Sequence, residues 1–347
     1  MQINKVKSEF FDVNTTNYTK RINVSADQTD LSNSATSYYT FAFVLNEWLE
    51  VNSVSNRKST EDKYRRLINQ HIIPELGNLS IAEITTEKIN AFINKKLSNG
   101  RLDNAGGLSH SYVRTISIII KSALNYSVEK NYRLPLSHLK IYMPKPEKKE
   151  YRILSNNSYQ VLSDYLTTNV CPVNLGILLS LYAGLRIGEV CALRWKNINI
   201  AARIIHITST ITRINNSQDN ISSKTIFKID CTKTNAGIRN IPIVSNLIAP
   251  IEQLENKDSC FILTGTEDFM NPRTFENKFH KILMNCGIEQ INYHILRHTF
   301  ATRCIQKGVD VKTLSEFLGH ADITTTLKTY VHSTLEQKLI EIEKISL

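Results

Sequence analysis

Apolar residues between positions 38 and 130 recur at the three- and four-residue spacing of amphipathic helices, and this limits the fold more than any other feature. One helix face is predicted over residues 41–49, and a second helix is expected to close before Pro74. Thr86 and Ser109 are suited to cap a third and a fourth helix, because their side-chain oxygens can accept unpaired backbone N–H groups. The pattern predicts a small four-helix domain.

Prolines and lysines cluster between residues 134 and 152, directly after this helical region. Such a composition favours an extended basic linker that can lie along a phosphate backbone. We therefore expect a helical domain over 38–133, a linker over 134–152 and a second domain over 153–347. Residues 1–37 are polar without a sustained period and predict an N-terminal arm that is disordered or poorly packed.

The second domain mixes helical and strand-like patterns. Helical segments from about 158 to 196 precede apolar alternation at 205–211 and 227–231, and a third strand is predicted over 239–243. The chain then returns to helix-sized units, expected at 273–285, 293–307, 311–318, in a short segment through Tyr330 and in a terminal segment. The predicted fold class is mainly α with a small β-sheet, the second domain being α+β.

Composition excludes several classes of protein. The longest apolar stretch, residues 175–185, is too short to span a bilayer, and the first thirty residues lack a secretory apolar block. We therefore expect a cytoplasmic protein without a membrane partner. The six cysteines form no C-x-x-C pair, which favours reduced thiols over disulfides or zinc. A net charge of +10 favours nucleic acid as a partner, although charge alone is weak support.

Six residues suited to phosphodiester chemistry are spread over the second domain. They comprise an arginine at a glycine-flanked helix junction, a lysine between two strands, a histidine and an arginine three apart on one helix, a histidine after a helix end, and a tyrosine. In chain order these are Arg186, Lys233, His294, Arg297, His320 and Tyr330. Such donors and cations suit a phosphodiester site with a side-chain nucleophile. No D-x-D-like carboxylate set stands beside them, so we expect neither a metal ion nor a cofactor.

Five segments, taken in order, resemble motifs of the tyrosine recombinases, also called the phage integrase family. They are IIPELGNLSIAEIT (72–85), GLRIGEVCALRW (184–195), TKTNAGIRNIPI (232–243), HILRHTFAT (294–302) and LGHADITTTLKTY (318–330). The chain looks most similar to integrases of phages and conjugative transposons, over roughly residues 38–334. The resemblance implies a helical SAM-like core-binding domain followed by a tyrosine-recombinase catalytic domain.

The resemblance also implies a role for each of the six residues. Tyr330 would be the nucleophile and would hold DNA through a 3′-phosphotyrosine. The two arginines would neutralise the non-bridging oxygens of the phosphate, because guanidinium groups do not lose their protons. Both histidines would donate hydrogen bonds there, and His294 would also help to move the tyrosine proton. Lys233 would protonate the leaving 5′ oxygen, and neither ATP nor metal would be needed.

The implied function is site-specific recombination that integrates and excises a mobile element. Its partners would be double-stranded DNA attachment sites and further copies of the chain in a tetrameric synapse, with accessory excision or DNA-bending proteins as additional candidates. Two alternatives remain at this point: a type IB topoisomerase that relaxes DNA, and a catalytically silent DNA-binding regulator. Residues 1–37 do not match the three-stranded arm-binding domain that many such integrases carry.

Three neighbouring features carry weaker expectations. Glu189 is expected to orient Arg186 or to cap its helix. Tyr293 and His298 flank the H-x-x-R segment and are expected to pack or to bind phosphate. Residues 334–347 show an amphipathic pattern after a capping box, which predicts a terminal helix that packs on its own domain or docks on a neighbouring subunit.

Overall fold

The protein is described by a computed structural model that divides into two compact units, Met1–Lys148 and Lys149–Leu347. The described residues are 39–53, 58–103, 105–132, 140–145, 152–215, 225–231, 235–330, 339 and 342–343. The predicted polar arm and most of the predicted terminal helix lie outside these ranges. Within them, no helix is long and apolar enough to cross a membrane.

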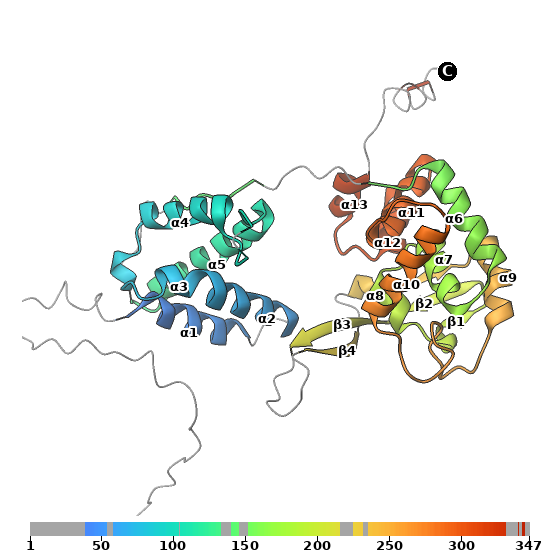
Figure 1. Ribbon diagram of the computed structural model, residues 1–347, viewed down its shortest axis with the longest axis horizontal. Helices are drawn as coiled ribbons and strands as arrows, with labels where there is room; N and C mark the ends of the chain where they lie inside the picture. Colours follow the sequence, from blue (N-terminus) through green and yellow to red (C-terminus); the bar gives the residue numbers. More distant parts are fainter. Residues whose placement is uncertain are drawn as a thin grey trace, which may run out of the picture. The chain divides into compact units, whose positions relative to one another are not determined.

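The first unit is helical, as the apolar spacing predicts (Figure 1). Its α-helices are α1 (Phe41–Ser53), α2 (Lys58–Leu67), α3 (Ile73–Leu76), α4 (Thr86–Asn99) and α5 (His110–Glu129). A π-helical turn, Ile68–Ile72, joins α2 to α3, and a 3-10 turn, Ile81–Glu83, precedes α4. The apolar faces of these helices form one buried cluster that includes Phe41, Trp48, Phe92 and Ile120.

Local sequence explains most of the helix ends in this unit. The Ser109 hydroxyl accepts the Tyr112 N–H and caps α5, as expected. Thr85, rather than the predicted Thr86, caps α4, because Thr85 has the extended backbone and accepts the Lys88 N–H. The second helix, α2, ends at Leu67 and so closes before Pro74, as predicted, but the π-helical turn continues the helical path into α3, which contains Pro74.

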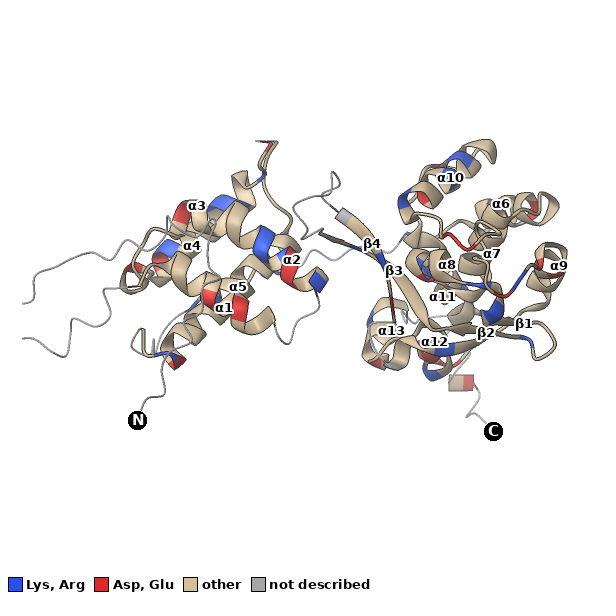
Figure 2. Cartoon of the chain, turned by 90° about the horizontal axis from the view of Figure 1, so that it is seen from below, with Lys and Arg blue, Asp and Glu red and all other residues tan. Residues whose placement is uncertain are grey.

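The described part of the predicted linker, residues 140–145, lies against the helical unit. The Tyr142 N–H donates to Asn90 Oδ1 at 2.8 Å, and the Asn90 amide donates to the Lys140 carbonyl at 3.1 Å. The segment is therefore hydrogen-bonded to α4. Basic and acidic positions both occur along the helices of this unit, so its charge is mixed rather than of one sign (Figure 2).

The second unit combines eight α-helices with five short strands among its described residues. The helices are α6 (Asn156–Thr168), α7 (Pro172–Ala183), α8 (Ile187–Ala192), α9 (Ser245–Leu254), α10 (Pro272–Asn285), α11 (His294–Gln306), α12 (Val311–Leu318) and α13 (Ile323–Tyr330). The strands are β1 (Ile198–Asn199), β2 (Ile204–Ile207), β3 (Ser209–Asn215), β4 (Thr225–Cys231) and β5 (Arg239–Pro242). Short 3-10 turns cover Trp195–Asn197 and Asn235–Gly237.

The strands form two antiparallel sheets instead of one. β1, β2 and β5 make a three-stranded sheet, with Ile205 opposite Ile241. β3 and β4 make a separate hairpin, with Ile211 opposite Ile229, and it projects from the body of the unit (Figures 1 and 2). The predicted strands are thus present, but β5 pairs with β2 rather than extending the hairpin.

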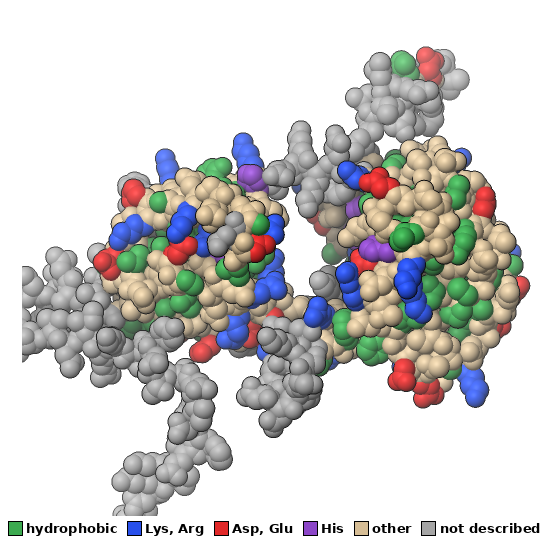
Figure 3. Space-filling view, viewed as in Figure 1, with side chains coloured by type: hydrophobic (Ala, Val, Ile, Leu, Met, Phe, Trp, Pro, Cys, Tyr) green, Lys and Arg blue, Asp and Glu red, His purple; other side chains and the backbone are tan. Residues whose placement is uncertain are grey.

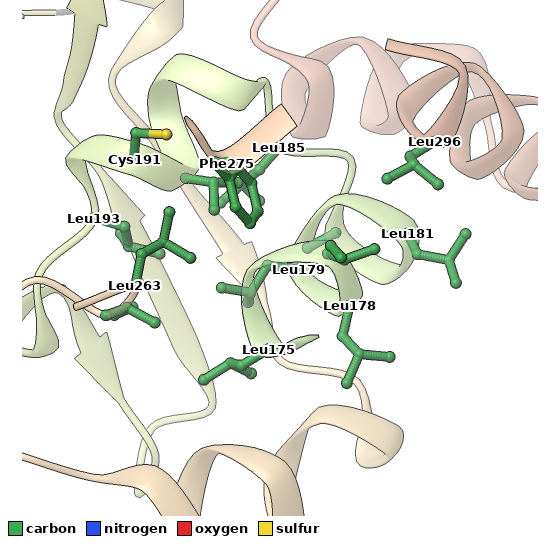
Figure 4. Close-up of a cluster of buried hydrophobic side chains, with 14 of the residues drawn as sticks. Leu175, Leu178, Leu179, Leu181, Leu185, Cys191, Leu193, Leu263, Phe275 and Leu296 are labelled. Atoms are coloured by element: carbon green, nitrogen blue, oxygen red, sulfur yellow. The ribbon is translucent and has the colours of Figure 1, made fainter. Parts of the chain in front are cut away.

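Helix α7 forms the centre of the second unit and packs against α6, α8, α9, α10 and α11. It is apolar on all sides, so Leu175, Leu178, Leu179 and Leu181 are buried in different directions (Figure 4). Gly184 ends the helix with φ of +67°, and a Cβ there would meet the Phe300 ring at 2.5 Å. This turn places the next residues, which begin the candidate site, at the edge of the core.

Candidate active site

A cavity of about 560 Å³ lies at one side of the second unit. Its walls come from the start of α8, from β3, from the turn before β5, from the start of α11 and from the segment between α12 and α13. The lining side chains that can carry charge or donate hydrogen bonds are Arg186, Glu189, Thr210, Thr212, His294, His320, Asp322 and Thr325. Histidine and basic side chains lie close together on the face of this unit that Figure 3 shows. The cavity is suited to an anion.

Glu189 holds two arginines on one buried carboxylate. Its Oε1 accepts from Arg186 Nη1 at 2.8 Å, and its oxygens accept from Arg239 Nη1 at 3.1 Å and Nη2 at 2.9 Å. Burial alone would raise the pKa of Glu189, but the Arg239 hydrogen bonds and the charges of Arg239, Arg186 and Arg297 outweigh it and lower the pKa to about 2. Glu189 is therefore ionised at neutral pH.

The same carboxylate also begins helix α8. Its Oε2 accepts the backbone N–H of Arg186 at 2.9 Å, which satisfies an N-terminal donor of the helix. Both expectations for Glu189 are confirmed, since it orients Arg186 and caps the helix. Arg186 keeps 36% of its side chain exposed, so part of its guanidinium remains open to the cavity.

Arg297 lies behind the cavity, with 1% of its surface exposed. Its Nη1 donates to the Gly184 carbonyl at 2.8 Å, and its Nη2 donates to the Leu318 carbonyl. Burial, together with the Arg186 charge, lowers the pKa of Arg297 to about 9, which leaves it charged at neutral pH. Arg297 therefore joins the turn after α7 to the turn after α12.

His320 contacts Arg297 and the helix that follows it. Its Nε2 lies 3.2 Å from Arg297 Nη2, and its Nδ1 lies 2.8 Å from Thr326 Oγ1. Because a guanidinium can only donate, Nε2 accepts, and Nδ1 carries the proton towards Thr326. Burial and the charges of Arg297, Arg186 and Arg239 lower the pKa of His320 to about 4. His320 is therefore neutral at neutral pH.

His294, His298 and Tyr330 form a row of three rings. The His294 and His298 rings meet edge to face with centroids 4.9 Å apart, and the His298 and Tyr330 rings lie 5.5 Å apart. His294 lines the cavity, and partial burial, His298 and Arg297 lower its pKa. The Tyr330 hydroxyl lies 2.9 Å from His298 Nδ1.

Tyr330 ends α13, and its side chain is buried at 7% exposure. Its ring packs against Ala301, Leu314 and Leu318 in a small apolar cluster of α11, α12 and α13. Tyr330 does not line the cavity. Its ring contacts His298, whose ring contacts His294, and His294 lines the cavity.

Five of the six predicted residues are thus described: Arg186, His294 and His320 line one cavity, Arg297 contacts His320 from behind it, and Tyr330 lies against His298. Lys233 lies in the stretch between β4 and the Asn235–Gly237 turn, outside the described residues. Of the flanking residues, Tyr293 packs as expected, since its buried hydroxyl contacts Ser180 at 2.7 Å and the Gly176 carbonyl at 3.2 Å. His298 contacts Tyr330 instead of the cavity.

Arg239 is a site residue that was not predicted. It is 9% exposed, and its Nε donates to the Phe317 carbonyl at 2.6 Å. The strand alternation could have identified Arg239. Arg239 and Ile241 share the buried face of β5, so an arginine lies where the alternation predicts an apolar residue. A charge at such a position requires a buried partner, and Glu189 supplies it.

Two family models match the chain. The phage integrase family model matches residues 147–337, and the model of the N-terminal SAM-like domain of phage integrases matches residues 40–97. The first match covers more than half of the chain and contains every residue of the site described above. The second lies in the helical unit.

Individual relatives agree with these models. The XerC-like tyrosine recombinase of Caldanaerobacter subterraneus subsp. tengcongensis is 27% identical over 334 residues, which cover 88% of this chain and 83% of the relative. The integrase of Staphylococcus phage L54a is 28% identical over 349 residues, which cover 89% and 94%. The Tn1549 transposon integrase, solved with circular intermediate DNA, shares the fold with a TM-score of 0.68 at 20% identity, covering 88% and 99%. The chain belongs to the phage integrase family.

Proposed function

We propose that this protein is a site-specific recombinase that cuts and rejoins DNA through a covalent 3′-phosphotyrosine, and that it integrates and excises a mobile element. One observation carries the proposal: Arg186, His294 and His320 line a cavity that suits an anion, Arg297 contacts His320 from behind it, and the Tyr330 hydroxyl lies behind the His298 ring. The likeness to a phage integrase and to a transposon integrase solved with DNA supports mobile-element DNA as the substrate.

In the proposed reaction the scissile phosphate occupies the cavity. Arg186 presents its open guanidinium to a non-bridging oxygen, and Arg297 stabilises the growing negative charge from behind. The phosphate charge raises the affinity of His294 and His320 for protons, so both can donate hydrogen bonds to it. Preorganised donors of this kind stabilise the pentacoordinate transition state more than the ground state.

Tyr330 Oη forms a bond to phosphorus as the bond from phosphorus to the 5′ oxygen breaks. Lys233 supplies the proton that this 5′ oxygen needs, which suits its place between β4 and β5. The phosphotyrosine conserves the energy of the phosphodiester, so a 5′ hydroxyl of a second strand can reverse the step without ATP.

The remaining parts of the chain have proposed roles as well. The helical domain over 38–133 and the catalytic domain over 153–347 would hold the DNA between them, with 134–152 as the connection. Recombination between two DNA sites would require four copies of this chain in a tetrameric synapse. The reaction would take place on DNA in the cytoplasm. Accessory excision or DNA-bending proteins stay as candidate partners.

The test is trapping of the covalent complex on a nicked suicide substrate built from the repeats that flank the gene. The wild type should form a protein–DNA adduct that survives denaturant, and Tyr330→Phe should bind the same DNA without forming it. Tyr165→Phe, which changes a tyrosine of α6 outside the candidate site, is the matched control and should form the covalent adduct in the wild-type yield. An adduct of undiminished yield with Tyr330→Phe would show that another residue attacks.

A further inference from the structure

The contact between His298 and the Tyr330 hydroxyl has no role in the reaction outlined above. His298 lies on α11 four residues after His294, so these two side chains share one face of the helix, and the rings meet with centroids 4.9 Å apart. His298 Nδ1 lies 2.9 Å from Tyr330 Oη, within ordinary hydrogen-bond distance. The contact reaches the atom that the proposed reaction uses as nucleophile.

The protonation state of His298 follows from its surroundings. Burial and the charge of the adjacent Arg297 lower its pKa, so the ring is neutral at neutral pH. A phenol hydroxyl can donate to the unprotonated nitrogen of a neutral imidazole. In the tautomer that carries its proton on Nε2, the Nδ1 lone pair of His298 accepts the Tyr330 proton across this 2.9 Å contact.

We propose that His298 is a catalytic residue that takes the proton from Tyr330 as the tyrosine attacks, and that it returns the proton when the strand is rejoined. The inference rests on the proposed function. It divides the work between two adjacent imidazoles: His294 faces the cavity and the phosphate, and His298 faces the nucleophile.

The bond from Oη to phosphorus forms while the O–H bond of Tyr330 breaks, and its proton moves to Nδ1 to give an imidazolium. The bond from phosphorus to the 5′ oxygen breaks, and that oxygen takes a proton from the general acid. The imidazolium is tolerated beside Arg297 because the entering phosphate brings negative charge into the same cluster. Rejoining runs the same transfers backwards.

His298→Asn is the informative change, since Asn places an oxygen acceptor at the δ position but cannot take a proton. In single-turnover cleavage of the suicide substrate by the full chain, we expect a loss of about 10²- to 10⁴-fold, the usual contribution of a general base. His298→Gln should show a similar loss and serves as the second variant if His298→Asn fails to fold. His206→Asn, in β2 and bonded to Asn240, is the matched control and should cleave at the wild-type rate.

The decisive arm replaces Tyr330 by 3,5-difluorotyrosine, whose phenol loses its proton more easily. A tyrosine that is already ionised needs no base, so the loss caused by His298→Asn should shrink by about tenfold or more. An equal loss with both tyrosines would overturn the proposal and leave His298 a packing role, and so would wild-type cleavage by His298→Asn. If the wild type itself forms no adduct, the proposed function fails and this inference fails with it.

Discussion

Removing the Arg239 guanidinium should destabilise the second unit by about 3 kcal/mol. The lowering of the Glu189 pKa from 4.5 to about 2 corresponds to about this free energy, at 1.36 kcal/mol for each pH unit. Arg239 heads the stabilising causes of that shift, and Glu189 is 3% exposed, so Arg239→Met leaves a buried carboxylate with only Arg186 beside it. Breaking a buried pair in this way costs about 3–5 kcal/mol.

The measurement is urea unfolding of the second unit followed by fluorescence. The chain has two tryptophans, Trp48 in the helical unit and Trp195 in the second unit, so a Trp48→Phe background leaves Trp195 as the reporter. Arg273→Met is the matched control, because its ion pair with Glu276 leaves the arginine 72% exposed and is worth less than about 1 kcal/mol.

The effect must also depend on pH with a defined sign. Because folding lowers the Glu189 pKa, its contribution is complete above the unfolded-state value of 4.5 and is lost as pH falls towards 2. Without Arg239, burial raises the Glu189 pKa of the folded variant, so the difference in stability between wild type and Arg239→Met should be largest at neutral pH and shrink as pH falls and this carboxyl takes up a proton. A loss below about 1 kcal/mol at pH 7, or a difference that does not change between pH 7 and pH 3, would refute the reasoning.

Two further outcomes follow from the proposed chemistry. Lys233→Ala should cleave an ordinary substrate poorly but regain most of its rate when sulfur replaces the bridging 5′ oxygen, because a thiolate leaves without a proton; equal defects on both substrates would remove Lys233 from the role of acid. The affinity of the full chain for its site should fall about 10³-fold or more between 50 and 200 mM salt if six to ten phosphates are contacted; a flat response in a filter-binding or fluorescence titration would contradict a clamp made by both domains.

Local signals were enough to predict most helices. The bounds predicted for α12 are confirmed, because Asp310 caps its start and Gly319 ends it with φ of +62°. The π-helical turn at Ile68–Ile72 was not predicted, since one extra residue per turn leaves the apolar spacing nearly unchanged. The division into two sheets also lay beyond the sequence, because strand partners are chosen by packing at long range rather than by alternation within a strand.

The site was predicted by residue but not by contact. Motif spacing pointed to Arg186, His294 and His320, and all three line one cavity from different elements. The motif spacing did not indicate that Arg297 would donate to two backbone carbonyls, because every residue has a carbonyl and its side chain does not reveal such a contact. His298 was expected to pack or to bind phosphate, because four-residue spacing on a helix shows which residues share a face but not what that face meets.

The charges around the cavity explain why its histidines stay neutral and why it should accept a phosphodiester. Among the described residues, Arg186 and Arg239 pair with the buried carboxylate of Glu189, and the charge of Arg297 also acts on it. Asp322 lies at the rim, exposed and bonded to Thr324, so water screens its charge. The excess positive charge disfavours protonation of His320. In the proposed reaction the same excess would match the two negative charges that a pentacoordinate phosphorus carries on its non-bridging oxygens, so the arrangement would be complementary to that transition state.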